Sequence, residues 1–395
     1  MAINDQTPYR LAIAGDGFGW GSVGLLAALM HVIRLRHKDL TFVGLDTDIG
    51  RPVLGRQAVE KWIHTSTLDD HGLARVLEQQ GVRAAVVVLN ALLASRLESI
   101  GCPVVYVDTM PFLWTEHEFI PRNATRYCAQ LCSALPRPCW PVLRGIEALR
   151  WVGGIVGPTP RIASARVPGK AVLTVGGLQS PVSTTGSVSA YLQLVLNPVL
   201  RAFRDRGFHH VVVAGNLEVH QLPIDVEAAH GLTLTGGRME RDEFVRELSS
   251  ADMIATSPGL TTMLEISAMG QRAIILPPQN LSQMMFASEV ANLVDSRIVL
   301  SWPSIVMDQN VIVRERERGE EAAIQAIYNH ITAASAAWPK GLPQLVDDSI
   351  AALAYASALE ITLAPLGAAF GNGGAGDVVD VLDEVLREGV VPSPV

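Results

Sequence analysis

The sequence predicts an α/β protein with two Rossmann-like domains, each a parallel sheet covered by helices. Hydrophobic residues make up 49% of the 395-residue chain but aromatic residues only 6%, a balance that favours the Val- and Ala-rich strands of buried parallel sheets. Short apolar strands alternate with amphipathic helices, which is typical of βαβ units. The alternation stops at the Gly- and Pro-rich stretch 153–168 and then begins again, so we interpret this stretch as a linker.

The periodicity places the elements of both halves. In the first half we expect strands at 10–14, 40–46, 83–90 and 103–108, with helices at 22–36 and 73–81. In the second half we expect strands at 170–177, 209–216, 232–237, 252–257 and 272–278, with helices at 188–207, 241–251, 260–269 and 282–294. The predicted domains are 1–165 and 166–340, followed by C-terminal helices, 341–395, that pack back onto the first domain.

Charge and hydropathy restrict the partners. The net charge is −8 and no basic face is evident, so a nucleic-acid polymer is excluded as a partner, whereas backbone amides can still bind a small anion. The chain shows neither a signal peptide nor about 20 consecutive apolar residues, so we expect a cytoplasmic protein without a membrane anchor. Cys102, Cys128, Cys132 and Cys139 form no C-x-x-C pair and are expected to be reduced, structural thiols, with no metal bound. The sequence leaves the oligomeric state open, a homodimer included.

The first glycine loop matches a dinucleotide fingerprint. Residues 19–24 read G-x-G-x-x-G, and Asp46 closes the next strand, a combination that favours an NAD(P)-dependent oxidoreductase. The match begins about five residues after the strand ends, although the fingerprint belongs directly in the strand–helix turn. A tightly packed loop that binds nothing is a second interpretation.

In the second half, every predicted strand delivers small or polar residues at its carboxyl end. The stretches are "VGG", "AGN", "TGGRM", "TSPGLTT" and "LPPQN". Because parallel strands bind ligands at their carboxyl ends, these stretches predict one wall of a binding cleft. In "TSPGLTT" a strand passes into a helix, which Thr261 and Thr262 would cap and whose start would receive an anion.

The segment 251–292, "ADMIATSPGLTTMLEISAMGQRAIILPPQNLSQMMFASEVAN", resembles the second domain of GT-B glycosyltransferases, which transfer a sugar from a nucleotide-sugar donor. The order of the Ala-Asp strand, small-residue loop, glutamate-bearing helix, glycine, apolar strand and glutamine carries the resemblance. It implies a GT-B fold, with two Rossmann-like domains facing across a cleft. It also implies a metal-independent enzyme that needs no cofactor and uses a UDP-sugar as co-substrate.

The resemblance also implies a donor site. The diphosphate would lie against Ser257, Gly259, Leu260, Thr261 and Thr262, with Gly176 and Gly177 approaching it from the first strand of this half. Glu265 would accept hydrogen bonds from the ribose, Arg238 and Met239 would read the base, and Asn280 and Gln283 would contact sugar hydroxyls. A surface or cap-side role for Glu265 and an exposed helix position for Gln283 stay open. The double change Thr261→Ala with Glu265→Ala is expected to weaken donor binding and leave the fold intact.

The first domain departs from the family pattern. Many inverting members carry a histidine base after the first glycine loop, but between Gly15 and Gly24 the only titratable group is Asp16. Asp16 is therefore the candidate general base, with Asp108 and His117 in reserve and a turn-forming role for Asp16 as the alternative. The candidate acceptor residues are Gly17, Phe18, Gly19, Trp20, Asp108, Phe112, Trp114 and His117, whose aromatic members suit a planar acceptor.

The stretches "GDGFGWGSVG" and "VDTMPFLW" are similar to cytosylglucuronate synthases of nucleoside-antibiotic pathways. That resemblance implies transfer of glucuronic acid from UDP-glucuronate to cytosine or hydroxymethylcytosine, with Arg238 or Arg122 meeting the sugar carboxylate. An oxidoreductase, a nucleotide-sugar epimerase and a nucleotide-sugar-binding protein that has lost its base remain as alternatives.

Overall fold

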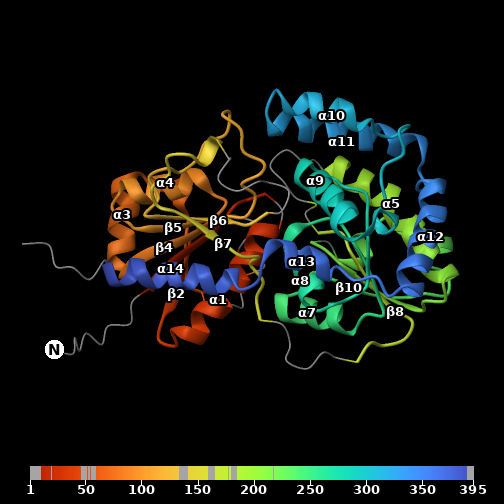
Figure 1. Ribbon diagram of the computed structural model, residues 1–395, viewed down its shortest axis with the longest axis horizontal. Coiled ribbons are helices and arrows are strands. Elements are labelled where there is room, and N and C mark those ends of the chain that lie inside the picture. Colours follow the sequence, from red (N-terminus) through yellow and green to blue (C-terminus); the bar gives the residue numbers. More distant parts are fainter. Residues whose placement is uncertain are drawn as a thin grey trace, which may run out of the picture. The chain divides into compact units, whose positions relative to one another are not determined.

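The computed structural model describes residues 10–18, 20–45, 51, 54, 59–132, 141–158, 165–176, 178, 185–216 and 218–388 (Figure 1). The chain divides into two compact units. Unit 1 comprises Met1–Gly17, Ser22–Pro158 and Phe370–Val395, and unit 2 comprises Phe18–Gly21 and Thr159–Ala369. Each unit contains one parallel sheet. Because both units consist of segments that are separate in the sequence, the chain passes between them more than once.

Unit 1 is built on a seven-stranded sheet of order β3-β2-β1-β4-β5-β6-β7, in which every neighbouring pair is parallel. Its strands are β1 (Arg10–Gly15), β2 (Thr41–Leu45), β3 (Val59–Ile63), β4 (Val82–Val88), β5 (Val104–Asp108), β6 (Arg126–Gln130) and β7 (Leu149–Val152). Its helices are α1 (Gly21–Arg36), α3 (Asp70–Gln79), α4 (Ala91–Ser99) and α14 (Gly374–Glu388).

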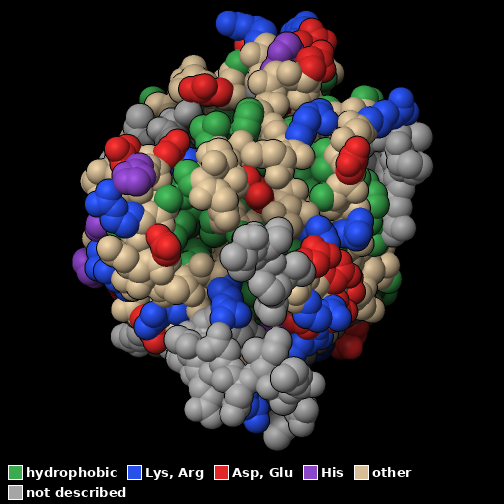
Figure 2. Space-filling view, turned by 90° about the vertical axis from the view of Figure 1, so that its left-hand side faces the viewer, with side chains coloured by type: hydrophobic (Ala, Val, Ile, Leu, Met, Phe, Trp, Pro, Cys, Tyr) green, Lys and Arg blue, Asp and Glu red, His purple; other side chains and the backbone are tan. Residues whose placement is uncertain are grey.

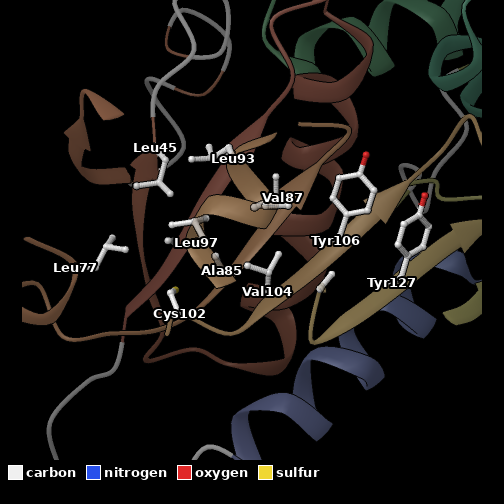
Figure 3. Close-up of a cluster of buried hydrophobic side chains, with 14 of the residues drawn as sticks. Leu45, Leu77, Ala85, Val87, Leu93, Leu97, Cys102, Val104, Tyr106 and Tyr127 are labelled. Atoms are coloured by element: carbon white, nitrogen blue, oxygen red, sulfur yellow. The ribbon is translucent and has the colours of Figure 1, made fainter. Parts of the chain in front are cut away.

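The core of unit 1 explains why its central strands are almost wholly apolar. Five consecutive residues of β4 and all five of β5 are buried, as expected for strands covered on both faces. Leu73 and Leu77 of α3 and Leu93 and Leu97 of α4 pack with side chains of these strands in one cluster (Figure 3). Each fully buried leucine stabilises the fold by roughly 1.5–3 kcal/mol.

The last helix, α14, belongs to unit 1 and contacts β4, β5, β6 and β7. Its first turn meets the end of β7 at a glycine-only crossing. A Cβ on Gly374 would lie 2.0 Å from the Gly153 carbonyl oxygen, and Gly153 N donates to Asp377 Oδ2 at 3.0 Å. The later turns of α14 form ion pairs with the rest of unit 1, from Arg126 to Glu388 at 2.6 Å and from Arg36 to Asp383 at 3.1 Å.

Unit 2 is built on a five-stranded parallel sheet of order β10-β9-β8-β11-β12. Its strands are β8 (Lys170–Thr174), β9 (His210–Ala214), β10 (Thr233–Gly237), β11 (Met253–Thr256) and β12 (Ala273–Ile275). Its main helices are α5 (Thr185–Asp205), α6 (Val226–Ala229), α7 (Arg241–Ser250), α8 (Leu260–Ala268), α9 (Leu281–Val290), α10 (Gln309–Arg316), α11 (Glu320–Ala337), α12 (Pro343–Ala358) and α13 (Ala364–Phe370). Both α11 and α12 pack against α5, whereas α14 packs on unit 1.

Three strands of unit 1 were not expected from the sequence. β3 is an edge strand with four exposed or half-exposed positions before its buried end, and β6 and β7 carry arginines within short runs. Such strands lack the continuous apolar run that marked β4 and β5. The first half therefore forms seven strands where the periodicity predicted four.

Charge and membrane features are unremarkable in the described chain. Figure 2 shows acidic and basic side chains interspersed on the face that it presents. Within the described residues, no helix combines the length and the apolar character needed to cross a membrane. Across the same ranges, no three His, Cys, Asp or Glu side chains come together as metal ligands would.

Candidate functional site

The strand order of unit 2 creates a switch point between β8 and β11. β8 pairs with β9 on one side and with β11 on the other, so the connections leaving β8 and β11 run in opposite directions along the sheet. Ligands of open parallel sheets bind outside the strand ends at such a point. Ser257 N donates to Thr174 O at 2.9 Å, which brings the loop after β11 against the end of β8. Gly176, two residues beyond β8, is half-buried at this edge.

The helix that starts at the switch point, α8, has no side-chain cap. Its N-cap is Gly259, in an extended conformation (φ −82°, ψ 126°), and Thr261 and Thr262 lie inside the first turn. The interpretation of these threonines as caps was therefore wrong, since a glycine occupies that position. The first-turn amides of Leu260, Thr261 and Thr262 have no intrahelical acceptor, and amides in this position bind anions.

Ser257 lies in a buried hydrogen-bond network beneath this loop. Its Oγ lies 3.2 Å from the Tyr191 hydroxyl, which also donates to Pro277 O at 3.0 Å. Gln279, only 1% exposed, donates from Nε2 to Gly176 O at 2.8 Å. Gln279 thus joins the ends of β8 and β12 beside β11. Gln279 belongs to the stretch "LPPQN", in which the resemblance implied a role for Asn280 rather than for Gln279.

Glu265 is buried and paired with an arginine that the sequence analysis did not single out. Its side chain is 5% exposed, and Oε1 lies 3.1 Å from Nη2 of Arg241, which is 6% exposed. Burial raises the pKa of Glu265, and the Arg241 charge opposes that rise. A surface or cap-side carboxylate is therefore excluded, because Glu265 lies in the second turn of α8 and away from solvent.

Arg238 and Met239 follow β10 directly. Arg238 is exposed and donates from Nη2 to Asn216 O at 3.3 Å, and its guanidinium lies 5.6 Å from the ring of Trp20, which is grouped with unit 2. Met239 is half-buried. Gly237 before them has φ 112°, a conformation that favours glycine, so the chain turns sharply here.

Asn280 and Gln283 are buried, and the fold already uses their carbonyl oxygens. Asn280 caps α9, with Oδ1 accepting from Gln283 N at 3.0 Å and from the Ser282 hydroxyl at 2.8 Å. Gln283 Oε1 accepts from Gln279 N at 2.9 Å. A sugar at this place would be met chiefly by their amide N–H groups. The open interpretation of Gln283 as an exposed helix residue is wrong, since it is 4% exposed.

Unit 1 has its own switch point between β1 and β4, where Asp16 follows β1. Asp16 N donates to Val88 O at 2.9 Å, and Asp16 O accepts from the buried Ser22 hydroxyl at 2.8 Å. The side chain is half-buried. Leu89, just past β4, has φ 62°, a left-handed conformation that costs a leucine roughly 1–3 kcal/mol. The backbone around Asp16 is therefore fixed at the sheet edge where ligands bind.

Asp108 ends β5 and is fully buried, with three hydrogen-bond donors around it. Its Oδ2 accepts from Trp114 Nε1 at 2.8 Å and from the Tyr127 hydroxyl at 2.7 Å, and Oδ1 accepts from Met110 N at 2.9 Å. Burial raises the pKa of Asp108 to about 6, against the lowering effect of these hydrogen bonds. Asp108 thus anchors the loop that carries Trp114.

Two tyrosines with tilted rings, one from β5 and one from β6, pack together beside Asp108. The rings of Tyr106 and Tyr127 lie 5.0 Å apart, and their hydroxyl groups point the same way (Figure 3). Burial raises the pKa of the Tyr106 phenol, and the charges of Asp108 and Asp16 raise it further. Asp16 directly follows β1 and Asp108 ends β5, so both carboxylates lie at the carboxyl end of the unit 1 sheet, and both act on this phenol.

The other predicted acceptor residues differ in how far they are exposed. Phe112 is 1% exposed, Trp114 is half-buried and His117 is exposed. Gly17, Phe18 and Trp20 are half-buried, and Gly19, Gly177 and Asp46 lie outside the described residues. Arg122 donates to the backbone oxygens of Arg144 at 3.0 Å and Val142 at 2.5 Å, so its guanidinium serves the fold. Cys102, Cys128 and Cys132 are buried and form no disulfide within the described residues, and Cys139 is outside the described part.

No protein-family model matches the sequence, and no curated protein matches it. Solved structures match by fold. Phytolacca americana UGT2, complexed with UDP-2-fluoro-glucose and pterostilbene, superposes with a TM-score of 0.51 at 13% identity, over 97% of this chain and 100% of that one. Spinosyn forosaminyltransferase SpnP superposes with a TM-score of 0.51 at 12% identity, over 96% of this chain and 100% of that one. UDP-glucose:anthocyanidin 3-O-glucosyltransferase in complex with UDP superposes with a TM-score of 0.50 at 13% identity, over 97% of this chain and 100% of that one. Together with the two parallel sheets, these likenesses confirm the predicted GT-B fold.

Proposed function

We propose that the protein is an inverting, metal-independent glycosyltransferase that moves a sugar from a UDP-sugar to a small acceptor. The observation that carries this proposal is the uncapped start of α8 at the β8/β11 switch point, with the buried Glu265 carboxylate one turn behind it. An anion and a polyhydroxyl group lying side by side would satisfy both features. A nucleoside diphosphate offers both in its diphosphate and its ribose.

The first turn of α8 would stabilise the leaving group. When the bond between the sugar C1 and the diphosphate oxygen breaks, negative charge grows on the diphosphate. The amides of Leu260, Thr261 and Thr262 and the helix dipole favour that charge, and they are in place before the reaction. Backbone amides placed in this way can stabilise the leaving diphosphate without a metal ion.

Unit 1 would bind the acceptor and take its proton. The acceptor nucleophile attacks C1 from the face opposite the diphosphate, forming the new bond as the old one breaks, so the configuration inverts. Asp16, fixed at the β1 edge, would receive the proton. Asp108 suits a different role, because three donors already occupy its carboxylate, and it would hold Trp114 in place for a planar acceptor.

The specific reaction that we propose is transfer of glucuronic acid from UDP-glucuronate to cytosine or hydroxymethylcytosine. A sugar carboxylate needs a cation. Arg238, exposed at the carboxyl end of β10, donates to one backbone oxygen, Asn216 O, at 3.3 Å, whereas the exposed Arg122 donates to two, so Arg238 is the stronger candidate. The UDP-2-fluoro-glucose of Phytolacca americana UGT2 and the UDP of the anthocyanidin glucosyltransferase support a UDP-linked donor for this fold.

A thermal-shift screen tests the donor class. The ligands are UDP, UDP-glucose, UDP-glucuronate, other nucleoside diphosphates, NAD and NADP, and a ligand that binds the native state raises Tm with its occupancy. Stabilisation by UDP compounds alone supports the proposal. Stabilisation by NAD or NADP and none by UDP would point to the oxidoreductase alternative. UDP-sugar binding without transfer to any acceptor would favour a non-catalytic binding protein.

A pair of variants tests the helix start itself. Thr261→Pro removes one first-turn N–H without breaking an intrahelical hydrogen bond, whereas Thr261→Val keeps that N–H and removes only the hydroxyl. We expect UDP affinity to fall about tenfold or more in the proline variant and much less in the valine variant, since hydrogen bonds to charged groups contribute about 1.5–3 kcal/mol. Glu321→Pro, at the same position of the equally uncapped α11, controls for proline at a helix start. If Thr261→Pro bound UDP as tightly as Thr261→Val and Glu321→Pro do, the diphosphate assignment would be contradicted.

A further inference from the structure

Arg241 occupies an unusual position for a charged residue. It is the first residue of α7, four residues after β10 ends, and its side chain is 6% exposed. Its Nη2 lies 3.1 Å from Glu265 Oε1, so a buried cation and a buried carboxylate connect the start of α7 to the second turn of α8. Arg241 Nη1 also lies 3.7 Å from the exposed Asp242 carboxylate. Charges are buried in this way only when they are paired.

The pairing with Glu265 is incomplete. Nε and Nη2 of Arg241 are buried and have no hydrogen-bond partner within the described part of the chain, so the 3.1 Å contact is an ion pair with poor hydrogen-bond geometry. These two nitrogens form the edge of the guanidinium that matches a carboxylate. A carboxylate has about four acceptor sites, and such an edge uses at most two of them. Glu265 therefore keeps acceptor capacity for another group while Arg241 holds it.

We propose that Arg241 is a positioning residue of the donor site, which keeps Glu265 ionised and turned to accept hydrogen bonds from both ribose hydroxyls, and thereby selects ribonucleoside over 2′-deoxyribonucleoside diphosphates. This inference rests on the proposed function. Only an ionised carboxylate accepts from two hydroxyls without offering a proton of its own.

Electrostatics explains why Glu265 needs Arg241. Burial raises the pKa of Glu265 and thus favours its neutral form, while the charge of Arg241 lowers that pKa. Among the described residues, Arg241 is the charged group that acts on Glu265. Without Arg241 the pKa of Glu265 rises further. The neutral form of the carboxyl group is then favoured up to a higher pH than in the wild type.

The test compares UDP and 2′-deoxy-UDP binding to the full-length protein by calorimetry from pH 6 to pH 9. For the wild type we expect UDP to bind at least about tenfold more tightly than 2′-deoxy-UDP across this range, the equivalent of one lost hydrogen bond to a charged group. In Arg241→Gln the preference should vanish at low pH and return as the pH rises. Arg241→Lys keeps the charge and should keep a preference that does not depend on pH.

The matched control is Arg272→Gln. Arg272 is a half-buried arginine of unit 2, paired with Asp252, and it precedes β12, whereas Arg241 follows β10 at the other edge of the sheet. Its loss should leave the UDP preference and its pH dependence unchanged. A purely structural role for Arg241 would lower affinity for both nucleotides equally at every pH, and that result would overturn the inference while leaving the proposed function standing.

A second measurement needs no ligand. Carboxyl ¹³C NMR, with the Glu265 signal assigned by its loss in Glu265→Gln, follows the titration of this group directly. We expect the midpoint to move upward by at least about one pH unit in Arg241→Gln relative to the wild type, a tenfold change in the protonation equilibrium. An unmoved midpoint would refute the role of Arg241. Failure of the wild type to bind UDP at all would overturn the proposed function, and the inference with it.

Discussion

Asp108 offers a quantitative test of the unit 1 site. Its pKa is about 6 in the folded protein, against an ordinary value of 3.8, because burial outweighs three hydrogen bonds. The folded state therefore binds this proton more tightly than the unfolded state does. The resulting stabilisation is fully present below pH 3.8 and is lost as the pH rises towards 6 and beyond. Asp108→Asn has no such titration.

The magnitude follows from the shift. A rise of about 2 pKa units corresponds to about 3 kcal/mol, at roughly 1.4 kcal/mol for each unit. The free energy of unfolding of the wild type, minus that of Asp108→Asn, should therefore fall by about 2.4 kcal/mol between pH 4 and pH 7.5, because part of the unfolded chain is already ionised at pH 4. The asparagine also turns an amide N–H₂ towards one of the three donors. At pH 4 the variant should consequently be less stable than the wild type by about 1–3 kcal/mol.

Urea denaturation of both proteins across this pH range measures the difference, because the contributions of all other groups cancel. Tyr127→Phe provides a check on the cause. It removes one donor that lowers the pKa of Asp108, so the loss of stability should move to higher pH. Parallel pH profiles for the wild type and Asp108→Asn would refute the reasoning, since they would mean that Asp108 titrates alike in the folded and unfolded chains.

Three further predictions concern the framework. Gly374→Ala should lower the free energy of unfolding by more than about 2 kcal/mol, because its Cβ would lie 2.0 Å from a backbone oxygen, whereas Gly376→Ala, with nothing within 4 Å, should be neutral or stabilising. Gln279→Ala should cost about 1–3 kcal/mol and weaken UDP binding, since Gly176 O loses its donor. Gly236→Ala should destabilise unit 2 in urea denaturation, because φ is 111° and the Cβ would lie 2.3 Å from Val213 O. Unchanged denaturation midpoints in Gly374→Ala and Gly236→Ala, or unchanged UDP affinity in Gln279→Ala, would contradict these assignments.

The structure also changes which substitution at Glu265 best tests donor binding. The double change Thr261→Ala with Glu265→Ala was expected to weaken donor binding and leave the fold intact. Glu265 is the partner of the buried Arg241, and removing one member of a buried ion pair costs about 3–5 kcal/mol. Glu265→Gln keeps the volume and one acceptor oxygen. It is therefore the better probe of the ribose contact.

The sequence alone determined the features that depend on neighbours along the chain. Strand and helix periods are local, so the alternation predicted the central strands of both sheets and the loop "TSPGLTT" at a strand's carboxyl end. The short strands β3, β6 and β7 escaped because they are held by pairing with neighbouring strands rather than by an apolar run. Capping was misjudged for a related reason, since the point at which α8 begins depends on how β11 delivers the chain to it.

Only the tertiary structure decided which distant groups meet. Glu265 pairs with Arg241, Gln279 bonds to Gly176, and Tyr127 bonds to Asp108, and none of these partners is adjacent in sequence. Each contact forms because the fold brings together segments that are distant in sequence, and burial then requires each polar group there to find a partner. Periodicity along the chain carries no record of that choice, so the sequence could indicate the edge of the sheet but not the partners that give its residues their charge and orientation.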